Sequence, residues 1–108
     1  MPFMFYPAVE ICLRSGQRIT LALVAEGERI DANTINDIMW KEMLDIAHEK
    51  WKQLKDAVKN QEFIDLVGVP IPSEDWDVVH DSLSDVYQFL TIRTSEIAFV
   101  RVGVFITY

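Results

Sequence analysis

Residues 9–23 read VEICLRSGQRITLAL, and this stretch decides the fold. Apolar residues alternate with polar or small ones on both sides of the Ser-Gly-Gln sequence. Such alternation is typical of a β-hairpin with one covered face and one face toward water. Gly16 lies in the turn, where a positive φ would penalise a Cβ atom. We therefore predict an antiparallel hairpin over residues 8–25, with Cys12 as a small filler on the second face.

A long amphipathic helix is predicted over residues 32–60. Apolar residues recur there in steps of three or four, which places them in one stripe on a helical surface. The stripe consists of Ile35, Met39, Met43, Ala47, Trp51, Leu54 and Val58. Asp31 or Asn33 would cap the first turn. At 1.5 Å per residue the helix would be roughly 40 Å long, which is more than the sheet of a small domain needs.

The remaining segments complete a single predicted domain of residues 1–108. We expect a strand over 62–68, an acidic segment with a short helix over 70–85, and a C-terminal hairpin over 86–107. The apolar spacing within 73–90 also allows one continuous helix, so both readings stay open at that point. The predicted fold is α+β: an antiparallel sheet of four to five strands packs on the long helix, with a short second helix.

Length and composition exclude several classes of protein. A chain of 108 residues is one domain, too short for a dinucleotide-binding enzyme or a large barrel. A single cysteine cannot form an internal disulfide, and a net charge of −7 argues against direct binding of nucleic acid. No apolar run approaches the roughly 18 residues of a membrane span. We expect a cytoplasmic protein that binds neither nucleic acid nor membranes.

The negative charge is concentrated in one segment. Residues 62–85 contain seven acidic residues and no lysine or arginine, whereas residues 34–61 carry five charges of each sign. Acids keep a small domain soluble, but such segregation also favours a surface that binds a basic partner protein. The predicted contact residues are Glu74, Asp75, Trp76, Asp77, Asp81 and Asp85, with the tryptophan as anchor.

Aromatic residues gather near both ends of the sequence. Side chains of this kind either close the core or form an edge for self-association. Together with the long helix they lead us to expect a homodimer, because two-fold symmetry is the commonest arrangement. The predicted self-association residues are Phe3, Phe5, Tyr6, Phe105 and Tyr108.

Motifs of familiar catalytic sites are absent from the sequence: there is no glycine-rich phosphate loop, no cysteine pair and no nucleophile elbow. Residues 45–49 and 77–81 share the order acid, apolar, apolar, His, acid. Carboxylate and histidine pairs on facing helices can hold metal ions. Short coincidences are frequent in a chain with 17 acids, so we predict no metal and no cofactor. The candidate ligands in this pattern are Asp45, His48, Asp77 and His80.

We expect a non-catalytic protein-interaction module, such as a small inhibitor or accessory factor, and assign no catalytic residue. The alternative is a small-ligand-binding domain with a pocket between the sheet and the helix that carries Trp40 and Trp51. A third interpretation is an enzyme that uses aspartate and histidine as acid–base pairs.

Overall fold

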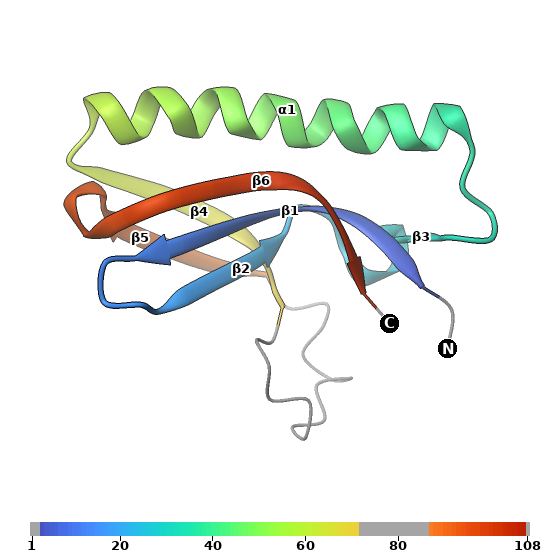
Figure 1. Ribbon diagram of the computed structural model, residues 1–108, viewed down its shortest axis with the longest axis horizontal. Coiled ribbons are helices and arrows are strands. Elements are labelled where there is room, and N and C mark those ends of the chain that lie inside the picture. The colour runs from blue at the N-terminus through green and yellow to red at the C-terminus, as the bar shows by residue number, and fades with distance from the viewer. Residues whose placement is uncertain (1–2, 72–86, 108) are drawn as a thin grey trace, which may run out of the picture.

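A computed structural model describes residues 3–71 and 87–107 (Figure 1). It confirms the α+β class, with an antiparallel sheet and one long helix, α1 (Asp37–Asn60). The strands are β1 (Met4–Leu13), β2 (Arg18–Ala22), β3 (Ile30–Asp31), β4 (Phe63–Pro70), β5 (Gln88–Arg93) and β6 (Ile97–Thr107). The 3-10 turns are η1 (Glu26–Glu28) and η2 (Thr94–Glu96). The acidic segment was predicted over 70–85; Pro70 belongs to β4, and the short helix expected in that segment falls outside the described residues.

The β1–β2 hairpin follows from the alternating sequence. Its register runs from Ala8 opposite Ala22 to Cys12 opposite Arg18. Gly16 has a φ of +93°, in the region that favours glycine, and its N–H donates to the Leu13 carbonyl at 2.9 Å. The turn residue and the alternation therefore specify the same register.

β1 is the central strand of the described sheet. β6 pairs with one side of it along nearly its whole length, while β2 and β3 share the other side. Residues 3–71 and 87–107 contain six strands, more than the four to five predicted, because the two-residue β3 also pairs with β1. β4 joins β2 through only two residue pairs and then pairs with β5. The antiparallel pair of β4 and β5, called the β4–β5 ribbon, lies behind β1 and β6 in Figure 1.

The main core lies between this ribbon, the central strands and α1. Its buried members come from five strands and from the helix. They are Val9, Ile11, Leu21, Leu54, Ile64, Leu66, Ile92 and Ile97. Burying aliphatic side chains of this size contributes about 1.5–3 kcal/mol each. The cluster therefore joins the ribbon to the rest of the sheet far more strongly than the two β2–β4 residue pairs.

The helix α1 runs along the β6 side of the sheet (Figure 1). Near its first turns, the Trp40 ring meets the Phe5 ring of β1 edge to face, with centroids 5.4 Å apart. Met43, Ala47 and Leu54 are its buried residues. In residues 3–71 and 87–107, no helix has both the length and the apolar character that crossing a bilayer requires.

The helix begins at Asp37, five residues later than expected, and neither Asp31 nor Asn33 is its cap. Asn36 is the N-cap, and its Oδ1 accepts a hydrogen bond from the Met39 N–H at 2.9 Å. Asp31 belongs to β3, and its carboxylate accepts from the Asn33 N–H at 2.8 Å. The Asp31 carboxylate is used in the turn after β3 and does not cap the helix. The helix therefore begins after the next residue that can cap it, which is Asn36.

Replacing Asn36 with alanine is expected to destabilise the protein by about 1 kcal/mol, because the Met39 N–H loses its acceptor. Urea denaturation followed by circular dichroism measures the loss. Asn33→Ala is the control, since the Asn33 side chain does not cap the helix. An equal loss in both variants would contradict the assignment of the cap.

The predicted C-terminal hairpin over 86–107 is wrong. β5 pairs with β4, and β6 pairs with β1. The turn η2 explains the difference, because Thr94 is tied to the start of β4. Its N–H donates to the Glu62 carbonyl at 2.8 Å and its hydroxyl to the Gln61 carbonyl at 2.7 Å. The chain therefore crosses from the ribbon to β1 instead of folding back on β5.

Candidate interaction surface on the ribbon

The β4–β5 ribbon has one covered face and one exposed face. In β4, Ile64 and Leu66 point into the core, while Phe63, Asp65 and Val67 point away from it. The same alternation in β5 buries Ile92 and exposes its neighbours on either side. This two-residue period is that of a strand with one face packed on a core.

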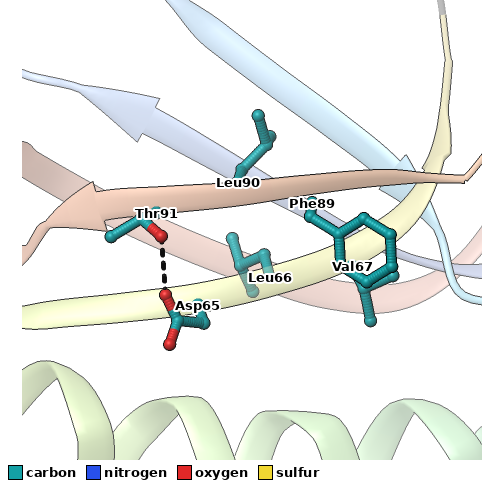
Figure 2. A pocket seen from close by; sticks show the side chains of 6 residues that line it. All are labelled: Asp65, Leu66, Val67, Phe89, Leu90 and Thr91. Carbon is teal, nitrogen blue, oxygen red and sulfur yellow. Dashed lines mark hydrogen bonds between the residues drawn. The ribbon is translucent and has the colours of Figure 1, made fainter.

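Three cross-strand pairs make up the exposed face of the ribbon. The Arg93 guanidinium lies 5.2 Å from the centroid of the Phe63 ring opposite it. The Thr91 hydroxyl donates to Asp65 Oδ1 at 2.7 Å, as the dashed line in Figure 2 marks. Phe89 lies opposite Val67. The face thus runs from a cation on an aromatic ring, through a polar pair, to an apolar pair.

A hollow of about 340 Å³ lies along the middle of the ribbon. It is lined by Asp65, Leu66, Val67, Phe89, Leu90 and Thr91 (Figure 2). The polar pair and the Phe89 ring with Val67 lie side by side along the two strands. Its volume is at the lower end of the roughly 300–1,000 Å³ of small-molecule pockets.

Phe89 is the most exposed large apolar residue of the described chain, at 83 %. Phe63 and Val67 on the same face are each more than two-fifths exposed. Isolated exposed apolar side chains are ordinary, but a row of them on one face of a strand pair is typical of a contact surface. These three residues could not be predicted as a contact surface from the sequence, because their juxtaposition depends on the pairing of β4 with β5.

The predicted acidic contact residues, Glu74, Asp75, Trp76, Asp77, Asp81 and Asp85, lie outside the described residues. Their role stays a prediction. The connection that contains them joins Ile71 to Tyr87, and β4 and β5 meet at that end through Gly68 opposite Gln88.

The residues predicted for self-association lie in different surroundings. Tyr6 is buried, and its ring lies 6.2 Å from that of Phe105 on the neighbouring β6. Burial raises the pKa of the Tyr6 phenol, and the Arg29 guanidinium 5.1 Å from the ring partly offsets this rise. Phe5 packs on α1, Phe3 is exposed, and Tyr108 lies outside the described residues. Tyr6 and Phe105 thus close part of the core, and self-association stays a prediction.

Asp45 and His48, from the predicted acid–histidine pattern, are both exposed on α1. Asp45 pairs with Lys41 at 2.8 Å, and the His48 ring stacks on that of Trp51. Within the described ranges, no group of three or more His, Cys, Asp or Glu side chains converges on a metal-sized site. Asp77 and His80 lie outside those ranges.

The alternative interpretation predicts a ligand pocket between the sheet and the helix that carries Trp40 and Trp51. Trp40 packs against Phe5, as described above, and Trp51 is a partly exposed residue of the helix surface. The Trp51 ring has His48 stacked on it and the Lys55 ammonium 4.6 Å from its centroid. The hollow described above lies instead on the β4–β5 ribbon, and neither tryptophan lines it.

Comparison of the chain with protein-family models, with curated proteins and with solved structures finds no match. Function is therefore inferred from the chemistry of the ribbon and from the distribution of charge along the sequence.

Proposed function

We propose that the chain is a non-catalytic protein-interaction module, acting as a small inhibitor or accessory factor, and that the outer face of the β4–β5 ribbon contacts its partner. The exposure of Phe89 carries this proposal. An aromatic side chain that is 83 % exposed on a regular strand leaves a large apolar area in water. Covering a phenylalanine of this kind contributes about 1.5–3 kcal/mol to association.

The arrangement around Phe89 suits a protein contact. Val67 extends the apolar area across the strand pair, and the Asp65–Thr91 pair beside it supplies polar groups that are already hydrogen-bonded. Energetic centres of interfaces combine an aromatic anchor with surrounding contacts that exclude water. Because Asp65 is charged, a partner that covers it must supply a hydrogen-bond donor or a cation, which suits a basic surface.

The charge distribution favours a basic partner. The segment 62–85 carries the whole net charge of −7, and its course includes β4. Complementary fields raise the rate of encounter and orient the two molecules before contact. The acidic residues from Glu74 to Asp85 would then steer a basic surface toward the Phe89 end of the ribbon.

A small-molecule ligand is the second candidate for this face. The hollow of about 340 Å³ beside Asp65 and Thr91 supports it. A protein partner is favoured because Phe89 projects into solvent, whereas aromatic residues of ligand pockets are largely enclosed by their surroundings. A cytoplasmic location and a homodimeric state, expected from the sequence, remain part of the proposal. The buried Cys12 suits a reducing compartment.

Replacing Phe89 with serine is expected to weaken partner binding by about tenfold or more, because the apolar anchor is lost. The tagged protein is used to purify partners from cells that express it, and the affinity of each purified basic partner is then measured by calorimetry. Ile38→Ser is the matched control, since Ile38 is a highly exposed apolar residue of α1. Equal affinities for wild type and Phe89→Ser, or the absence of any saturable partner, would contradict the proposal.

A further inference from the structure

We propose that the partner contributes an extended segment that pairs, as an additional strand, with the open edge of β5. This inference rests on the proposed function and names its mode of contact. A strand at the edge of a sheet presents unpaired N–H and C=O groups, and an extended peptide can satisfy them while its side chains meet the exposed face.

The two ends of the sheet differ in how they are covered. β6 forms one end, and α1 runs along it (Figure 1). β5 forms the other end, and among the described residues it pairs with β4 alone. Covering an edge with a helix is a common protection against further pairing. The β5 edge lacks that protection in the described part of the chain.

The register shows which backbone groups of β5 point outward. The Thr94 N–H donates to the Glu62 carbonyl, so Thr94 and Glu62 form a hydrogen-bonded pair of the ladder. Hydrogen-bonded and non-hydrogen-bonded pairs alternate in an antiparallel ladder. Every second residue of β5 before Thr94 is therefore in a hydrogen-bonded pair. The backbone N–H and C=O groups of Ile92, Leu90 and Gln88 bond to β4. The N–H and C=O groups of Phe89, Thr91 and Arg93 therefore point away from β4.

The same three residues carry the exposed side chains of β5. Phe89, Thr91 and Arg93 all belong to the outer face, and none is buried. A strand added at this edge would bond to their backbone groups and would place its own alternate side chains beside them. The side chains on the other face of the added strand would point toward the core. They would cover Leu90, which is only half-buried at the edge of the core.

Charge selects the occupant of this edge. The chain carries a net charge of −7, so its long-range field attracts a basic segment. A second copy of the chain carries the same net charge of −7, so long-range repulsion opposes self-pairing. The occupant we infer is an extended, basic, partly apolar segment of another protein.

The test uses a decapeptide of alternating valine and lysine, and the same peptide with glutamate in place of lysine. Binding is followed by the amide resonances of the isotope-labelled full chain. The lysine peptide is expected to shift the Phe89, Thr91 and Arg93 amides, and the glutamate peptide to bind at least about tenfold more weakly. A lysine peptide N-methylated at alternate residues, which lacks the strand-pairing N–H groups, should lose binding to the same extent.

Two variants at one position separate the edge from the face. Thr91→Pro removes the outward N–H, and the β4 ladder is retained because Thr91 is in a non-hydrogen-bonded pair. Thr91→Val removes the hydroxyl bond to Asp65 and keeps the N–H. We expect Thr91→Pro to weaken the lysine peptide about tenfold or more and Thr91→Val to stay within about twofold of wild type.

Several results would overturn the inference. Equal binding of the methylated and unmethylated peptides would show that the peptide contacts the outer face of the ribbon without pairing as a strand. In that case the proposed function would still stand if Phe89→Ser lost its partner. No shift with either peptide would also reject the open edge. A concentration-dependent dimer in sedimentation that Thr91→Pro abolishes would assign the edge to a second copy of the chain.

Discussion

Replacing Leu54 with alanine is expected to lower the free energy of unfolding by about 2–5 kcal/mol. Leu54 is the α1 residue in the buried cluster that also contains residues of β1, β2, β4, β5 and β6. Removing its isobutyl group leaves a cavity where the helix meets the β4–β5 ribbon and the strands around β1. The surrounding strands are rigid, so they collapse only partly into this space. Urea denaturation followed by tryptophan fluorescence measures the change.

Leu44→Ala provides the matched control on the same helix. Leu44 is more than two-fifths exposed, so its truncation should cost within about 1 kcal/mol. Similar losses for Leu44→Ala and Leu54→Ala would show that α1 does not pack through the face that carries Leu54.

Gly68→Ala is the second substitution with a large expected effect, a destabilisation of about 1–3 kcal/mol or more. A Cβ atom at Gly68 would lie 2.7 Å from the Ala22 carbonyl oxygen and 2.8 Å from the Leu21 Cβ. Neither atom is the end of a flexible side chain, so relief requires movement of the backbone of β2 or β4. The position is where β4 passes from its pairing with β5 to its pairing with β2. Thermal denaturation followed by circular dichroism checks the result.

Gly103→Ala is the control for this substitution. Gly103 also lies in a strand, β6, but a Cβ atom there meets nothing within 4 Å. Its replacement should leave the stability unchanged or raise it by up to about 1 kcal/mol, because alanine has less conformational freedom to lose on folding. A loss at Gly103 as large as at Gly68 would mean that strand flexibility, and not close packing, explains both effects.

The parts of the fold that follow from local sequence were predictable, and the parts that depend on distant pairing were not. The alternation around Gly16 and the stripe from Met43 to Leu54 reflect the periods of a strand and a helix. The helix start moved because pairing of Ile30 with Phe5 draws the preceding residues into β3. The partner of β5 was set by Thr94, whose bonds to Gln61 and Glu62 span more than thirty residues.

The candidate site shows the same limit. Asp65 and Phe89 are both visible in the sequence, but nothing local indicates that they share one face, since that requires the β4–β5 register. The acidic character of 62–85 was predictable from composition alone. The sequence thus indicates the charge of the proposed partner, whereas the apolar anchor and the β5 edge follow only from the pairing of β4 with β5.

The position of β1 between β2 and β6 also has a consequence for the kinetics of folding. Met4 pairs with Thr107, so pairing β6 with β1 closes a loop of about a hundred residues. The entropic cost of closing so long a loop slows this step of folding. The β1–β2 hairpin and α1 rely on local contacts and form early by comparison. Until β6 pairs with β1, that side of β1 exposes unpaired backbone N–H and C=O groups, so the folding chain is most vulnerable to misassociation before its last described strand docks.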